Sequence, residues 1–217
     1  MAEPFDVVLL DLYDTIVWSE WSRLRDLIGR RLDVDPSRLT KAFTDTRPAR
    51  GVGAFGDVRG DMAAVLDTAG LDADPTLVDE LVDLERTELA RGVHLYDDVL
   101  PTLAELRARG VKTALVSNCS HSTRPVVDRL GLEEAFDQVM LSYEVKAMKP
   151  DPAIYRLTLE RLDDASPERG VFVDDQPQYC DGGAAVGLAT RLIIRTNEDA
   201  PADTRGHQVV TDLRPLL

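Results

Sequence analysis

The pattern of hydrophobic positions begins with an unbroken apolar run, Val7-Val8-Leu9-Leu10, which ends on Asp11. Apolar runs without alternation are typical of strands that are buried on both faces of a parallel sheet. The period then changes, and residues of about 17 to 91 show helical spacing with no strand signal. Within this block, residues 47–61 hold four glycines and three arginines, and we expect a mobile loop there.

From Val99 onward, helical patterns alternate with short apolar runs. Strands are predicted at residues 112–116, 138–141, 170–173 and 190–194, with amphipathic helices between them. Strands that alternate with helices predict an α/β fold with a doubly wound parallel sheet. The helical block after the first strand is then an insertion over the C-terminal edge of that sheet, where it can act as a lid. We therefore expect a core of residues 1–16 and 92–217 and a helical cap of residues 17–91.

The net charge of the chain excludes some classes of binding partner. The 217 residues carry a formal net charge of -14 and are 44% hydrophobic, which suffices for a sizeable core. Nucleic acid and anionic membranes attract basic surfaces, so neither is expected as a partner. A small anionic substrate stays possible because a bound cation can invert the local field. Two cysteines, Cys119 and Cys180, make no disulfide framework, and we see no signal peptide or membrane helix. We expect a cytoplasmic protein, as a monomer or a homodimer.

Polar residues follow, or lie near, the ends of four predicted strands: Asp11, Ser117, Lys149 and the pair Asp174-Asp175. Taken singly, each is compatible with a turn or a helix cap. The predicted topology, however, brings all of them to one crevice at the carboxyl ends of the strands. Carboxylates that converge there repel one another unless a cation lies among them, and Mg²⁺ prefers such oxygen ligands. A hydroxyl and a lysine beside them can hold a phosphoryl group during transfer to a carboxylate.

At this point the sequence resembles the haloacid dehalogenase superfamily of hydrolases. The first motif of that family matches Asp11-Leu12-Tyr13-Asp14-Thr15 with one departure, and the second, a strand-end Ser or Thr, matches Leu115-Val116-Ser117-Asn118. The third matches Lys149-Pro150-Asp151-Pro152-Ala153-Ile154-Tyr155, and the fourth matches Val173-Asp174-Asp175. The resemblance implies a Rossmann-like core with an α-helical cap. It also implies an Asp11 nucleophile, with Ser117 and Lys149 as catalytic partners and Thr15 and Asn118 in supporting positions.

The departure lies at Tyr13, because family phosphatases carry at that position an aspartate that acts as general acid and base. A tyrosine there is similar to the 2-haloacid dehalogenases, which need no metal. The acidic pair Asp174-Asp175, in contrast, is similar to the metal-dependent members, and a metal can bind the backbone carbonyl of Tyr13 whatever its side chain is. We therefore expect a magnesium-dependent phosphatase acting on a small phosphorylated metabolite, with Mg²⁺ held by Asp11, the Tyr13 carbonyl, Asp175 and Asp174. A metal-free dehalogenase and a catalytically weak binding or regulatory protein are the alternatives.

The substrate is the part of the function that the sequence leaves open, because loops of the cap determine it. The arginines of the glycine-rich segment, Arg47, Arg50 and Arg59, are candidates for contact with an anionic substrate if they face the crevice. We expect the chain to cross between core and cap near residues 16–18 and 92–97.

Overall fold

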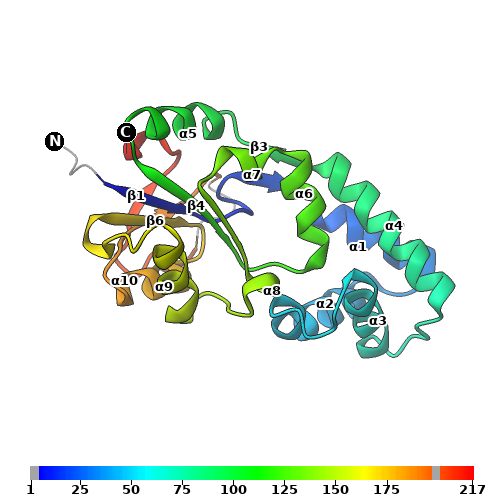
Figure 1. The fold of residues 1–217 in the computed structure, drawn as a ribbon. Helices are drawn as coiled ribbons and strands as arrows, with labels where there is room; N and C mark the ends of the chain where they lie inside the picture. Colours follow the sequence, from blue (N-terminus) through cyan, green and yellow to red (C-terminus); the bar gives the residue numbers. More distant parts are fainter. Residues whose placement is uncertain (1–4, 197–200) are drawn as a thin grey trace.

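The computed structural model describes residues 5–196 and 201–217 of the chain (Figure 1). The expectation that no leader precedes the first strand rests partly on residues 1–4, which lie outside the described residues. Among the described helices, none combines the length and the apolar character that crossing a membrane requires.

Six strands pair in parallel to form the central sheet, in the order β5-β4-β1-β6-β7-β8. Their bounds are β1 (Val7–Leu10), β4 (Lys112–Ser117), β5 (Gln138–Leu141), β6 (Gly170–Asp174), β7 (Ala189–Ile193) and β8 (Gln208–Val210). The chain moves outward from β1 through β4 to β5, and then returns to the other side of β1 as β6. The sheet order therefore reverses beside β1, and open α/β sheets bind ligands at such a point, beyond the carboxyl ends of the strands.

Helices cover both faces of the sheet, which is why the central strands carry unbroken apolar runs. The β1 side chains alternate between the two layers, with Val8 and Leu10 in one buried cluster and Val7 and Leu9 in the other. The first layer packs against α5 (Val99–Ala108), α6 (Arg124–Arg129) and α7 (Leu132–Ala135), and the second against α9 (Pro152–Arg161) and α10 (Pro177–Ala185) (Figure 1). The prediction of a doubly wound, Rossmann-like α/β sheet is confirmed.

The segment after β1 folds into four helices, which we call the helical unit: α1 (Trp21–Leu32), α2 (Pro36–Gly51), α3 (Val58–Thr68) and α4 (Pro75–Gly92). Three of them begin at an aspartate whose side chain accepts a hydrogen bond from the first turn, namely Asp35, Asp57 and Asp74. The unit has a buried apolar cluster of its own, and it lies beyond the sheet at the side of α6 and α8 (Ser142–Val145) (Figure 1). The division of the chain into a core and a cap at residues 17 and 91 stays a prediction.

Two local expectations were wrong. The loop predicted at residues 47–61 is confined to residues 52–57, because α2 continues through Pro48 to Gly51 and the Asp57 side chain already caps α3. Residues 17–91 also include a strand. β2 (Val17–Ser19) pairs antiparallel with β3 (Val93–Leu95), so that the two crossings between the sheet and the helical unit form one ribbon. Its strands are three residues long, which is too short for a periodic signal.

Arg195, which follows β7, ties this crossing to the sheet. Its Nη1 atom donates to both carboxylate oxygens of Asp98 at 2.9 Å, while Nε and Nη2 donate to the backbone carbonyl of Thr15 at 2.9 and 2.6 Å. The guanidinium carbon also lies 4.2 Å from the centroid of the Tyr96 ring. Both charged side chains are nearly buried, with 5% of Arg195 and 15% of Asp98 exposed. Through the Thr15 carbonyl, Arg195 therefore fixes the loop after β1 to the segment that follows β7.

Replacing Arg195 with methionine should lower the free energy of unfolding by about 3–5 kcal/mol, because Asp98 would be left as a largely buried charge without its partner. The Arg31→Met variant is the control, since Arg31 pairs with Glu80 where both side chains are about half exposed. Such a surface pair contributes about 0–1 kcal/mol. Urea unfolding monitored by circular dichroism measures both, and equal losses would contradict the role of Arg195.

Candidate active site

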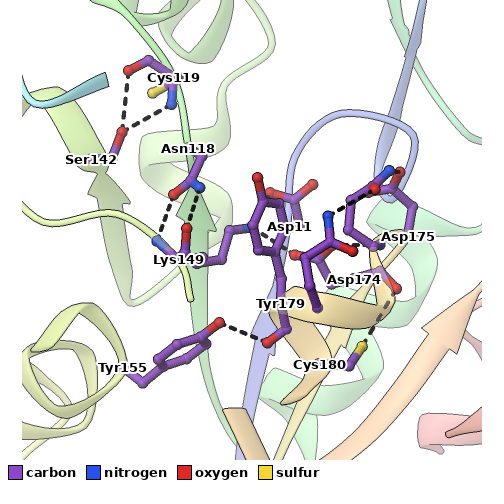
Figure 2. Close-up of polar contacts among 12 residues, drawn as sticks. Asp11, Asn118, Cys119, Ser142, Lys149, Tyr155, Asp174, Asp175, Tyr179 and Cys180 are labelled. Carbon is purple, nitrogen blue, oxygen red and sulfur yellow. Dashed lines mark hydrogen bonds and ion pairs between the residues drawn. The ribbon is translucent and has the colours of Figure 1, made fainter. Parts of the chain in front are cut away.

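Three carboxylates and one lysine meet at the carboxyl ends of β1 and β6 (Figure 2). Lys149 Nζ lies 2.5 Å from Asp11 Oδ1 and 2.6 Å from Asp174 Oδ2, and only 2% of the lysine is exposed. Asp11, Asp174 and Asp175 each offer a carboxylate oxygen within 4.8 Å of the other two. The structure therefore brings together the polar strand ends that the sequence singled out in its first, third and fourth motifs.

The backbone of Lys149 is held by Asn118, which follows β4. The Asn118 amide donates to the Lys149 carbonyl at 2.8 Å, and its carbonyl oxygen accepts from the Lys149 amide at 2.8 Å (Figure 2). The ammonium group also lies over two aromatic rings, with Nζ 5.3 Å from the centroid of Phe172 and 5.2 Å from that of Tyr179. Burial alone would lower the pKa of Lys149, but the charges of Asp11 and Asp174 raise it above its usual range. The lysine is therefore a permanent cation in a fixed place.

One lysine does not balance three carboxylates. Burial holds the pKa of Asp174 well above its usual range, although Lys149 opposes this shift. Burial, together with the charge of Asp11, raises the pKa of Asp175 to about 7. Three carboxylates beside one ammonium group leave negative charge in excess when they are ionised, and a divalent cation with oxygen ligands would remove that excess. The donor set thus fits Mg²⁺, while the Tyr13 carbonyl as a further ligand stays a prediction.

The hydroxyls of Ser117, at the end of β4, and Thr15, in the loop after β1, are buried without a hydrogen-bond partner among the described residues. A buried hydroxyl that lacks a partner costs free energy, so such groups are usually satisfied by a ligand or by water. The Ser117 side chain also lines the same cavity as Asp11, where it can donate to a bound oxyanion.

That cavity has a volume of about 390 Å³ and lies between the sheet edge and the helical unit. Arg47 and Arg50 of α2 line it, and so does Arg25 of α1, which the sequence analysis did not single out. Arg50 is oriented by its own helix, because it donates to the Phe43 carbonyl at 2.8 Å. Arg59 is not part of the lining, since it forms an ion pair with Asp79 in which both side chains are about half exposed.

Tyr13 lines the cavity two residues after Asp11. Its hydroxyl lies 3.3 Å from Thr123 Oγ1, within hydrogen-bond distance. Burial raises the pKa of the phenol above its usual range, an effect that the hydrogen bond with Thr123 only partly offsets. Near neutral pH the phenol therefore stays protonated and cannot serve as a general base. Its ring fills space at the boundary between the sheet and the helical unit.

Two acids of the helical unit, Glu85 and Asp61, were not expected from the sequence, and they are only 6% and 5% exposed. The helical spacing of buried positions in α4 could have indicated Glu85. Val78, Leu81 and Leu89 are the other buried residues of α4, and Glu85 falls on the same stripe. A carboxyl group on the apolar face of a helix is seldom buried without a reason, and Glu85 lines the cavity.

Comparisons with known proteins agree with this geometry. The family model for haloacid dehalogenase-like hydrolases matches residues 5–187. The chain is 33% identical over 122 residues to Phosphatase MT3486 of Mycobacterium tuberculosis and 35% identical over 123 residues to (S)-2-haloacid dehalogenase 1 of a Pseudomonas species. These matches cover 55% and 53% of the chain, and they span about half the length of each relative, 54% in both cases.

Solved structures extend the likeness to nearly the whole chain. A HAD phosphatase from Thermococcus onnurineus matches with a TM-score of 0.68 and 25% identity, over 97% of this chain and 95% of that one. A 2-haloacid dehalogenase from Pseudomonas syringae matches with a TM-score of 0.72 and 22% identity, over 98% and 96%. The fold is therefore shared by phosphatases and dehalogenases alike.

Replacing Lys149 with methionine should lower the free energy of unfolding at pH 7 by about 3–5 kcal/mol, because it leaves buried carboxylates without their cation. The Lys146→Met variant is a matched control, since Lys146 is exposed and lies three residues earlier in the same loop. Guanidinium unfolding in metal-free buffer measures both. A Lys149→Met variant as stable as the control would show that the lysine does not balance the acidic cluster.

Proposed function

Because the chain belongs to the haloacid dehalogenase-like hydrolases, whose family model spans residues 5–187, we propose that it is a magnesium-dependent phosphatase. Its substrate is a small phosphorylated metabolite, and its nucleophile is Asp11. The observation that carries the proposal is the excess of buried acid, with the carboxylates of Asp11, Asp174 and Asp175 around the single Lys149. A dehalogenase must accept the carboxylate of its haloacid, and this cluster would repel that group unless a metal neutralised it.

The residues of the site divide the chemistry among them. Asp11 attacks the phosphorus atom, and its carboxylate is held in place by the ammonium of Lys149. Lys149 also supplies positive charge beside the equatorial phosphoryl oxygens, and the buried hydroxyl of Ser117 donates to one of them. Mg²⁺ bound by Asp11, Asp174 and Asp175 would supply further positive charge to the same oxygens. Asn118 acts through Lys149, whose backbone it fixes.

We propose that the helical unit acts as the cap over this site. The cavity between it and the sheet is large enough for a small metabolite, and Arg47 and Arg50 supply positive charge on the side away from the carboxylates. An anionic group elsewhere on the substrate can bind there. The β2–β3 ribbon is the crossing about which the cap can move, near the predicted hinges at residues 16–18 and 92–97.

A dehalogenase is the second candidate, and Tyr13 is the observation that favours it. In that reaction, Asp11 attacks the carbon that bears the halogen, halide leaves, and no protonated leaving group or metal is needed. The relative named (S)-2-haloacid dehalogenase 1 supports this candidate, just as the relative named as a phosphatase supports the first. A catalytically weak binding protein is the remaining class, and it would turn over neither substrate.

Replacing Asp11 with asparagine should reduce kcat by a factor of at least about 10³, because the amide cannot form the covalent intermediate. The assay runs aryl phosphates, alkyl phosphates and 2-haloacids in parallel with Mg²⁺, and it measures phosphate and halide release. Asp6→Asn is the control, because Asp6 is exposed at the other end of the same strand. Halide release without phosphate release by the wild type would favour the dehalogenase, and release of neither would favour a binding protein.

Adding Mg²⁺ to the metal-free protein should raise Tm by about 5–10 °C at a concentration about a hundredfold above the dissociation constant. Asp175→Asn should shrink this shift to less than half, because it removes a ligand. The same variant should be more stable than the wild type without metal, because it removes a buried charge from an acidic cluster. Differential scanning calorimetry gives both values. A wild-type Tm that does not respond to Mg²⁺, with hydrolysis that survives chelator, would contradict the metal.

A further inference from the structure

The leaving group of the proposed reaction faces the helical unit. In an in-line displacement, the bond that breaks lies opposite the attacking oxygen, and Asp11 attacks from the end of β1. The departing oxygen therefore points into the cavity under α2 and α4. An alkoxide needs a proton as it leaves, and the water of the second step must give one up. Tyr13 stands where the related phosphatases place an aspartate for this purpose, so the proton has to come from another group.

Four carboxyl groups line the cavity among the described residues: Asp11, Asp14, Glu85 and Asp175. Asp11 is the nucleophile, and Asp175 belongs to the proposed metal site. Asp14 is exposed to solvent, in a turn with a left-handed backbone (φ of 58°). Glu85 is the remaining carboxyl group. It is buried, it comes from the helical unit, and it lies on the side of the cavity toward which the leaving group points.

The Glu85 carboxyl group lies among residues from both halves of the molecule. Ser122, on the sheet side, and Arg50, on α2, line the same cavity, and the charge of the Arg50 guanidinium attracts the carboxylate. Tyr13, the side chain that replaces the usual acid, lines the same cavity as Glu85. The charged and titratable groups that share its surroundings are Arg25 on α1, Arg50 on α2, Asp61 on α3 with its partner His121, and Tyr13 after β1.

We propose that Glu85 is the general acid and base of the phosphatase reaction, supplied by the helical unit in place of the residue that Tyr13 displaces. This inference rests on the proposed function. It assigns to the cap a chemical step in addition to substrate recognition, and it makes hydrolysis depend on closure, because Glu85 reaches the departing oxygen only while α4 covers the sheet edge.

The two steps balance. In the first, an Asp11 oxygen bonds to phosphorus while the bond from phosphorus to the substrate oxygen breaks, and that oxygen takes the proton of Glu85 to leave as an alcohol. In the second, Glu85 takes a proton from water as the water oxygen bonds to phosphorus and the bond to Asp11 breaks. Inorganic phosphate and free Asp11 result, and Glu85 is protonated again.

The ionisation of Glu85 suits both steps. Burial raises the pKa of this carboxyl group to about 7, although the charge of Arg50 opposes the shift. An acid-base group works best when its pKa is close to the working pH, because both forms are then present. An exposed glutamate, with a pKa of about 4.3, would be almost wholly ionised at neutral pH and could not act as the acid.

The test compares Glu85→Gln with the wild type in rapid mixing with Mg²⁺. With an alkyl phosphate, kcat should fall by about 10² to 10⁴, because the alkoxide leaves without a proton. With p-nitrophenyl phosphate, the burst of p-nitrophenol should keep its rate within about threefold, since this leaving group needs no acid, while the turnover that follows should slow. An unchanged burst also shows that the variant is folded with its nucleophile in place.

The pH profile separates chemistry from packing. Alkyl phosphate turnover by the wild type should decline as the pH rises through about 7, because Glu85 must carry a proton to act as the acid. Glu85→Gln should lose this limb. Glu88→Gln is the matched control: Glu88 lies on the same helix, where it pairs with Arg23 and does not line the cavity, so its rate and profile should match the wild type.

Restoring an acid at the usual position completes the test. Adding Tyr13→Asp to Glu85→Gln should recover alkyl phosphate turnover by at least about tenfold, because the aspartate takes over the proton transfer. If Glu85→Gln does not fold, Glu85→Asp should retain the limb near pH 7 with a lower kcat. Wild-type hydrolysis whose rate and profile are unchanged by Glu85→Gln overturns this inference alone. No phosphate release by the wild type overturns the proposed function and the inference together.

Discussion

The burial of one ammonium group among three carboxylates is the constraint on which the rest of the structure depends. Lys149 can stay charged in the interior only because Asp11 and Asp174 contact it on either side, and those acids can stay buried only because the lysine is there. The lysine and the acids come from three separate parts of the chain, so the sheet must place β1 beside β6, and Asn118 must fix the lysine from the end of β4. The apolar layers on both faces of the sheet supply the rigidity that this arrangement requires.

Charge is distributed unequally between the two halves of the molecule. The carboxylates that fit a metal belong to the sheet, whereas the arginines that line the cavity belong to the helical unit. A phosphorylated substrate suits such a cavity, because its phosphoryl group can approach a cation at the sheet while its remaining anionic groups face Arg47 and Arg50. Glu85 is the exception on the helical side. Burying its carboxyl group costs free energy, and the role in proton transfer that we propose gives a reason for that cost. Asp61 of α3 also connects the helical unit to the segment after β4, since its carboxylate accepts a hydrogen bond from His121 at 2.8 Å.

Much of the fold could be predicted because its strands are buried on both faces. β1 and β6 are unbroken apolar runs, and their ends mark Asp11, Asp174 and Asp175 in the sequence itself. Lys149 does not directly follow a predicted strand. It was expected at the site because it lies near a strand end in the predicted topology, and the family motif around it supported that prediction. β2 and β8 were missed because each has three residues and depends on pairing with distant segments. Arg59 was a candidate for substrate contact only because it was predicted to lie in a loop. It lies instead in the first turn of α3, where Arg59 pairs with Asp79.

The separation along the chain between Asp11 and its lysine has a consequence for synthesis. The two are 138 residues apart, and β1 finds its first partner only when β4 is made. The four helices between them, in contrast, pack mainly against one another and are contiguous in sequence. A chain emerging from the ribosome can therefore complete the helical unit first, while β1 stays an unpaired apolar strand with an exposed edge. Unpaired apolar strands of this kind promote aggregation, and β1 stays in that state until β4 has been made.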